Sequence, residues 1–177
     1  MTCFAQPEQI GLSINGHSDV LDFAREELNL FLGKAYKLSG NSNPDWQLVL
    51  ETDSKLTEGS FNIQHLKNGK QNQIILRGSN DAAVLHAVYT FLEKAGVRFE
   101  ITGAFIPVKV DITQLTGYSE TIHPKVKKRG IRQHINFPMD ISSYPLNEAK
   151  EYIRNLARLR FNFITFHSYP GHWYVEC

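Results

Sequence analysis

The sequence predicts an α+β protein: a two-layer domain, in which two helices cover one face of a mostly antiparallel sheet, followed by a strand–helix–strand unit. Three observations support this prediction. Two segments repeat apolar residues every three or four positions, as amphipathic helices do. Short strand-like runs surround these segments in the order β-α-β-β-β-α-β, and the end of the chain reads as strand, helix and strand with short joints.

The first half of the first domain, which spans residues 9–102, contains a strand, a helix and a second strand. Apolar residues alternate over 9–15 and again over 46–51, which is the period of a strand with one buried face. Between these strands, Ser18 is placed to cap a helix that ends at Gly33.

The second half of this domain adds a hairpin and another helix. Asn68-Gly69 lies between the strand-like runs 61–66 and 73–76, and Asn-Gly is the strongest short hairpin signal because both positions tolerate positive φ. A second amphipathic helix over 81–95 precedes a last strand at 97–101. Two helices and these strands give the two-layer domain.

Residues 103–125 hold scattered Gly and Pro without clear periodicity, and we interpret them as an interdomain linker. Within this stretch, 106–112 either extends the sheet or begins the linker.

The strand–helix–strand unit occupies residues 126–177. Apolar residues alternate over 126–137, Asn147 is placed to cap an amphipathic helix over 147–160, and aromatic and β-branched residues favour a strand over 161–169. We expect two parallel strands with a right-handed crossover. Because such a unit leaves a sheet edge and a sheet face uncovered, we expect it to begin a larger domain that is truncated here.

Composition excludes several classes of function. The chain has 177 residues, 42% hydrophobic and 21% charged, with a net charge of +1, so its charge balance does not indicate a nucleic-acid partner. No apolar run is long enough to span a membrane. Cys3 and Cys177 form no metal or disulfide pattern, and no phosphate-binding or cofactor motif is present. We interpret the basic run at 125–132 as a solvated linker rather than a nucleic-acid patch, because alternation divides its side chains between two faces.

The N-terminus, residues 1–8, allows two interpretations. Cys3 and Ala5 are small residues two apart, as a signal peptidase site requires, so the segment is either the remnant of a secretory signal or a disordered terminus. The first interpretation implies a periplasmic or extracellular location.

Four segments resemble the N-terminal region of known glycoside hydrolases: Ile-Ile-Leu-Arg-Gly at 74–78, the helix end and strand at 91–99, Arg129-Gly130, and Phe-Asn-Phe-Ile-Thr-Phe-His at 161–167. Their layout is similar to that of the family 20 β-N-acetylhexosaminidases and the family 67 α-glucuronidases. The resemblance implies a non-catalytic accessory domain like hexosaminidase domain 2, followed by the start of a (β/α)8 barrel (TIM barrel).

The resemblance to family 20 is partial at the level of single residues. Asn162 and His167 match the family's Asn and second His on the second barrel strand, whereas Thr165 and Pro170 replace its first His and its Asp. Phe137 stands where the family usually carries a substrate-binding Arg. The family's catalytic acid pair lies on a later strand, so the resemblance implies no catalytic residue in this chain.

Four polar residues become candidates for binding sugar hydroxyls because active sites of such barrels lie at the carboxyl ends of the strands: His134, Asn136, His167 and Tyr169. The alternative is that these side chains satisfy one another inside the barrel. His167 and His172 are not accompanied by a carboxylate or thiolate pattern, so we predict no metal site.

The sequence therefore predicts the N-terminal accessory portion of a secreted bacterial glycoside hydrolase, inactive as given, which binds carbohydrate in the full-length protein. Two alternatives remain: a stand-alone module that binds glycans or a protein partner, and a structural dimerisation domain. The first prediction implies that the apolar stripe Tyr152, Ile153 and Leu156 buries poorly, and that the chain can self-associate through the exposed barrel start.

Overall fold

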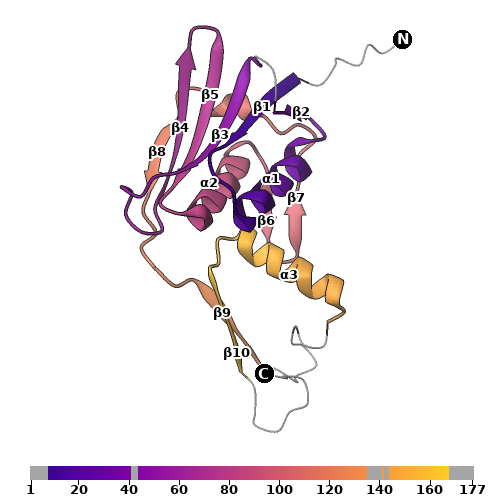
Figure 1. The fold of residues 1–177 in the computed structure, drawn as a ribbon. Coiled ribbons are helices and arrows are strands. Elements are labelled where there is room, and N and C mark those ends of the chain that lie inside the picture. Colours follow the sequence, from indigo (N-terminus) through magenta and orange to yellow (C-terminus); the bar gives the residue numbers. More distant parts are fainter. Residues whose placement is uncertain (1–7, 41–43, 135–140, 142–143, 168–177) are drawn as a thin grey trace, which may run out of the picture. The chain divides into compact units, whose positions relative to one another are not determined.

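The computed structural model describes residues 8–40, 44–134, 141 and 144–167 (Figure 1). The chain divides into two compact units. The first comprises residues 1–98 and 106–125, and the second comprises residues 99–105 and 126–177. No helix in the described ranges is long and apolar enough to cross a membrane.

The first unit is built on a six-stranded sheet with the order β2-β1-β3-β5-β4-β8. Its strands are β1 (Glu8–Ile14), β2 (Tyr36–Ser39), β3 (Trp46–Thr52), β4 (Phe61–Asn68), β5 (Gln71–Gly78) and β8 (Ser119–Ile122). β1 pairs in parallel with β2 and β3, and β3 pairs in parallel with β5, whereas β4 pairs antiparallel with β5 and β8.

The sheet is therefore mixed, and the prediction of a mostly antiparallel sheet was wrong. Two features of the topology explain the difference. The crossover through the first helix returns the chain in the same direction and adds β2, a strand of four residues that the sequence pattern does not predict. The second strand of the β4–β5 hairpin then inserts between β4 and β3, which makes β5 parallel to β3.

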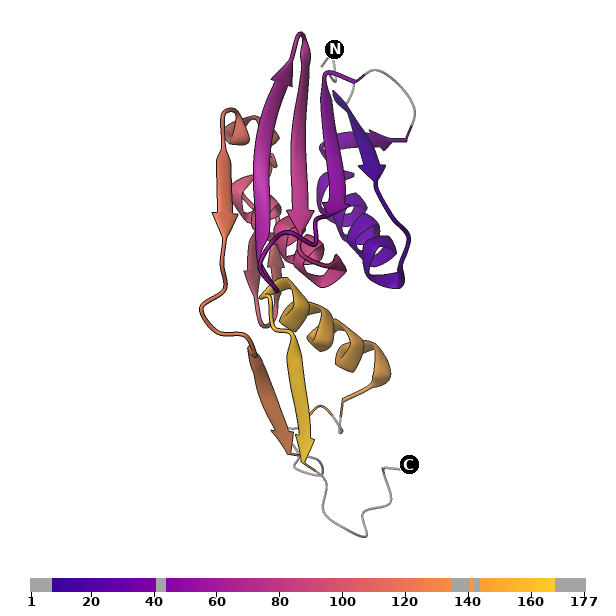
Figure 2. The same cartoon turned by 60° about the vertical axis from the view of Figure 1, so that its left-hand side comes forward.

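Two helices, α1 (Asp19–Leu32) and α2 (Asp81–Lys94), cover one face of this sheet (Figure 1, Figure 2). Ser18 caps α1 as predicted, because its hydroxyl accepts a hydrogen bond from the Leu21 amide at 3.2 Å. Asn80 caps α2 in the same way, and its side-chain oxygen accepts from the Ala83 amide at 2.9 Å. The predicted first and last residues of both helices are confirmed to within two residues.

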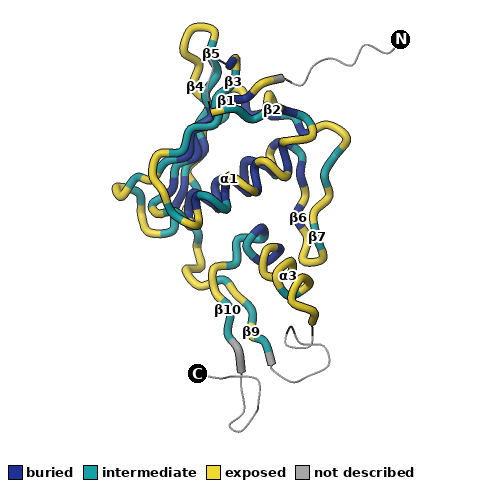
Figure 3. The backbone as a smooth tube through the Cα atoms, turned by 45° about the vertical axis from the view of Figure 1, so that its right-hand side comes forward, coloured by how far each residue is buried: buried dark blue, intermediate teal, exposed yellow. Residues whose placement is uncertain are grey.

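The core lies between the helices and the sheet. Figure 3 shows buried positions recurring along α1 and along the strands of the sheet. The strand side chains on this face are at most 2% exposed: Ile10, Leu48, Leu50, Phe61, Ile63, Ile74 and Leu76. The apolar alternation seen in the sequence thus marks the face that the helices bury.

The segment predicted as a linker contributes structure to the first unit. It includes a 3-10 helix, η1 (Ile112–Leu115), whose two end residues are 1% exposed, and β8, which pairs with β4. The Tyr36 hydroxyl donates a hydrogen bond to the Val110 carbonyl at 2.9 Å. Residues 106–112 do not extend the sheet; instead, β6 (Arg98–Glu100) and β7 (Gly103–Phe105) form a separate two-stranded sheet just before them. One turn of 3-10 helix and a four-residue strand are too short to show a period in the sequence.

Gly78 permits the close junction between β5 and α2. A Cβ atom at this position would lie 2.3 Å from the Val84 amide nitrogen and 2.6 Å from the Ala83 carbonyl carbon, so no larger residue fits without moving backbone. The strand can therefore end directly beneath the first turn of the helix that covers it.

We predict that Gly78→Ala destabilises the first unit by about 2 kcal/mol, because the added methyl group overpacks a backbone contact. Urea unfolding followed through the NMR amide signals of β3 and β5 measures this loss. Gly40→Ala is the matched control, since a Cβ atom there meets nothing within 4 Å. Equal stability of the two variants would contradict the prediction.

Candidate functional site

The second unit contains the strand–helix–strand arrangement that the sequence predicts: β9 (Gly130–His134), α3 (Leu146–Arg158) and β10 (Phe163–His167). β9 and β10 are parallel, as expected. The helix begins before Asn147, contrary to the predicted cap: the Pro145 carbonyl already accepts the first helical hydrogen bond, from Ala149 at 3.0 Å. Asn147 therefore lies inside the first turn.

The register of β9 and β10 pairs two candidate site residues. His134 lies directly across from His167, and each is the last residue of its strand. Because the strands are parallel, both residues stand at the same, carboxyl-terminal edge of the pair. The side chains of these two histidines, and the other candidates Asn136 and Tyr169, lie outside the described residues.

The opposite edge, at the amino-terminal ends of both strands, is fixed by side chains that hydrogen-bond to backbone groups. The Asn162 side chain accepts a hydrogen bond from the Arg129 amide and donates one to the Lys127 carbonyl, both at 2.9 Å. The Arg129 guanidinium donates to the carbonyls of Arg160 at 3.1 Å and Val126 at 2.6 Å. Asn162, which matches a family 20 position in the sequence, thus acts here as a positioning residue.

The end of α3 has the hydrogen bonding of a Schellman motif. The Phe161 amide donates to the Leu156 carbonyl at 2.9 Å, and the Arg160 amide donates to the Ala157 carbonyl at 2.8 Å. Arg160 consequently has a φ of +63°, in the left-handed region that usually favours glycine. After this turn the chain continues through Asn162 into β10.

The apolar stripe of α3 is buried only in part. Leu156 is 4% exposed, whereas Ile153 is 48% exposed and Leu146, at the start of the helix, is 71% exposed. The Tyr152 hydroxyl accepts a hydrogen bond from Gln133 Nε2 at 2.9 Å, which ties the helix to β9. The prediction of poor burial is confirmed for Ile153 and is wrong for Leu156.

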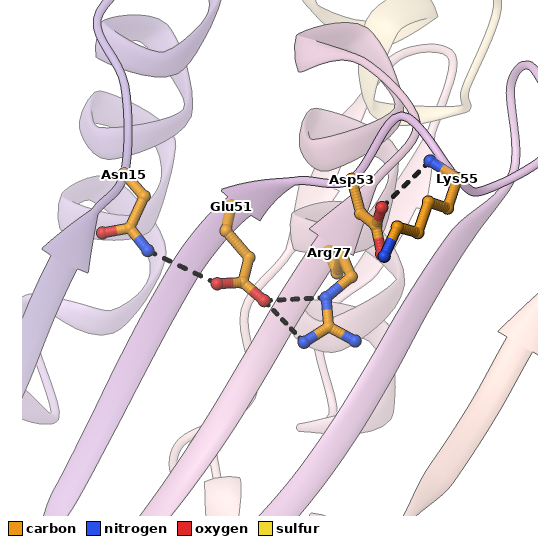
Figure 4. A network of polar contacts seen from close by, with 5 residues as sticks. All are labelled: Asn15, Glu51, Asp53, Lys55 and Arg77. Atoms are coloured by element: carbon orange, nitrogen blue, oxygen red, sulfur yellow. Dashed lines mark hydrogen bonds and ion pairs between the residues drawn. The ribbon is translucent and has the colours of Figure 1, made fainter.

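A polar network crosses the sheet of the first unit at the carboxyl ends of its parallel strands (Figure 4). Glu51 and Arg77 face each other in the β3–β5 register, and their ion pair spans 2.6 Å from Arg77 Nη2 to Glu51 Oε1. Asn15 donates to the other oxygen of Glu51 at 3.3 Å, and beside them the Lys55 amide donates to Asp53 at 2.9 Å. Asn15, Glu51 and Arg77 thus link the ends of three neighbouring strands, whereas the Asp53–Lys55 contact is a separate local turn. In the sequence, Arg77 is part of the segment 74–78, and no local pattern there indicates its partner on β3.

Within the described ranges, no group of three or more His, Cys, Asp or Glu residues is arranged to hold a metal ion.

The fold is similar to that of solved glycoside hydrolases. A family 20 exo-β-N-acetylglucosaminidase from Vibrio harveyi, solved with N-acetylglucosamine, matches 92% of this chain with a TM-score of 0.57 and 16% identity. A β-N-acetylhexosaminidase from Bacteroides fragilis matches 92% with a TM-score of 0.57 and 16% identity. A Streptomyces plicatus β-hexosaminidase, solved with its GlcNAc product, matches 89% with a TM-score of 0.55 and 14% identity.

These matches confirm the resemblance to family 20 hexosaminidases at the level of fold. The chain spans 22%, 29% and 30% of the length of the three enzymes, respectively. Neither a protein-family model nor a curated protein matches the sequence.

We predict that Asn162→Ala destabilises the second unit by about 1–2 kcal/mol, because two backbone hydrogen bonds are lost at the start of the strand pair. Asn147→Ala is the matched control, since Asn147 is exposed and does not cap the helix. Thermal unfolding of the two variants measures the difference. A larger loss for Asn147→Ala would mean that the sequence-based cap is correct.

Gly130→Ala should separate β10 from β9, because a Cβ atom at residue 130 would lie 2.0 Å from the Phe163 carbonyl oxygen. We expect amide hydrogen exchange of the paired residues Arg132 and Thr165 to accelerate by about tenfold or more, with no change in the amides of β3 and β5. Unchanged exchange in β9 and β10 would contradict the observed register.

Proposed function

We propose that this chain is the N-terminal accessory portion of a glycoside hydrolase. In this proposal the first unit is a non-catalytic α+β domain of the hexosaminidase domain 2 type, and β9–α3–β10 is the first repeat of a (β/α)8 barrel. The observation that carries the proposal is the parallel pairing of β9 with β10, which brings His134 and His167 to one edge, in a chain whose fold matches family 20 enzymes. Binding residues of such barrels lie at the carboxyl ends of the strands.

His134 and His167 would bind the sugar in the full-length protein, together with Asn136 and Tyr169, which follow them closely in the sequence. Imidazole, amide and phenol groups both donate and accept hydrogen bonds, as sugar hydroxyls require. The opposite edge, fixed by Asn162 through backbone hydrogen bonds, would hold the two strands in register beneath the bound sugar.

The catalytic acid pair would lie outside residues 126–167. Glycoside hydrolysis generally needs two carboxyl groups that face each other across the scissile bond. In the described part of this stretch, the carboxylates are Glu148 and Glu151, and both are on α3 rather than at a strand end. Glu151 also pairs with Arg158 at 2.7 Å.

The exposed apolar side chains of the second unit support a barrel that continues. Leu146, Ile153 and Phe163 are 71%, 48% and 46% exposed, as expected for a helix and a strand that pack against later repeats. The same exposure is the basis for proposing that the 177-residue chain self-associates.

We also propose a bacterial source and an extracytoplasmic location, and the location rests on the signal-like spacing of Cys3 and Ala5. A mature secreted protein that begins at Gln6 would support it.

The gene that encodes the chain provides the first test. We expect the reading frame to continue past the Cys177 codon with further strand–helix repeats and a carboxylate pair, and the extended protein to hydrolyse at least one of a panel of chromogenic glycosides that the 177-residue chain leaves intact. A stop codon directly after Cys177 would contradict the proposal, and glycan binding by the 177-residue chain would then favour a stand-alone module.

In the extended enzyme, His134→Ala and His167→Ala should each lower kcat/KM by about tenfold or more, because a hydrogen bond to substrate is lost. The matched control is His17→Ala, whose side chain in the first unit is 88% exposed. Loss of activity in the control, or full activity in both site variants, would exclude the assigned sugar-binding role.

A further inference from the structure

The first unit contains a pocket of about 330 Å³ between α1 and the strands β1 and β2. This volume is at the lower end of the range for small-molecule sites, roughly 300–1,000 Å³. The pocket is lined by Leu12, Ile14, Arg25, Asn29, Leu38, Ser39 and Gly40.

The pocket arises because β2 is shorter than β1. β2 pairs only with residues 8–11 of β1, so the carboxyl half of β1 continues beyond the last pair, Gly11 with Ser39. Leu12 and Ile14 lie on the side of the sheet that faces the helices, in phase with the buried Ile10. Leu12 and Ile14 extend past the end of β2 on the same face as Leu38, and these three half-buried side chains form an aliphatic wall.

The polar wall of the pocket comes from α1. Arg25 and Asn29 are four residues apart and therefore project from the same face of the helix. Arg25 Nη1 lies 3.8 Å from Asp22 Oδ1, and its side chain is 53% exposed. An exposed ion pair at this distance contributes little, so the guanidinium can bind a second carboxylate.

We propose that this pocket binds a small carboxylic acid with a short aliphatic body. Leu12, Ile14 and Leu38 would contact the aliphatic part, and Arg25 would bind the carboxylate through its planar pair of donors. The described lining residues include no aromatic side chain on which a sugar ring could stack, and their aliphatic wall favours a flexible alkyl chain over a sugar ring. The proposal is independent of the glycoside hydrolase assignment.

Hexanoate is a suitable probe, with hexanol and hexylammonium as companions that keep the aliphatic body and change the head group. We expect saturable NMR shifts of the Leu12, Leu38 and Gly40 amides with hexanoate, weaker binding of hexanol and the weakest binding of hexylammonium. Arg25→Gln should weaken hexanoate by about tenfold and leave hexanol within about twofold, because only the charge-assisted hydrogen bonds are lost.

Three further variants make the test selective. Asp22→Asn should tighten hexanoate binding, since it removes the carboxylate that competes for Arg25, whereas Asp19→Asn in the same helical turn should not. Lys34→Gln removes an exposed cation just beyond the helix and serves as the control for net charge.

Absence of saturable shifts, equal binding of hexanoate and hexylammonium, or an equal loss of hexanoate affinity in Lys34→Gln and Arg25→Gln would each overturn the proposal. These readouts use the 177-residue chain and require no hydrolytic activity.

Discussion

The first unit depends on the burial of one strand, β5, from three directions. β5 pairs with β3 on one side and with β4 on the other, and α2 covers its inner face. Ile74 and Leu76 on that face have no exposed surface. Because Gly78 has no side chain, the helix can begin immediately after the strand and stay close to it. In the sheet order, β4 and β8 lie outward from β5 on the side away from β3.

Local chemistry in the sequence predicted much of the fold. Ser18 and Asn80 are residues whose side chains satisfy free amides at a helix start, and both do so in the structure. The hairpin predicted at Asn68-Gly69 is confirmed, but its turn lies one residue later: Asn68 pairs with Gln71, so the turn consists of Gly69, at a φ of +60°, and Lys70. In each case a few neighbouring residues determine the conformation, so the pattern can be read without knowledge of the rest of the chain.

The failures concern features that neighbours in the sequence do not determine. Whether β3 lies beside β1 or beside β4 depends on contacts between distant segments, so the parallel character of the sheet was not predictable from strand order alone. The predicted cap at Asn147 failed because Pro145 already starts the helical hydrogen bonding. In the candidate site, the sequence predicted the strands that carry His134 and His167. The role of Asn162 required the structure, because its partners at residues 127 and 129 are backbone groups more than thirty positions away.

The chain path between the two units limits how they can be separated. Since residues 99–105 belong to the second unit and residues 106–125 return to the first, the polypeptide passes between the units three times. A truncation after residue 98 would remove β8 from the sheet and expose the edge of β4, which favours edge-to-edge aggregation. A gene-level exchange of the first unit as a cassette would therefore have to extend to Lys125 and carry the intervening β6–β7 hairpin with it.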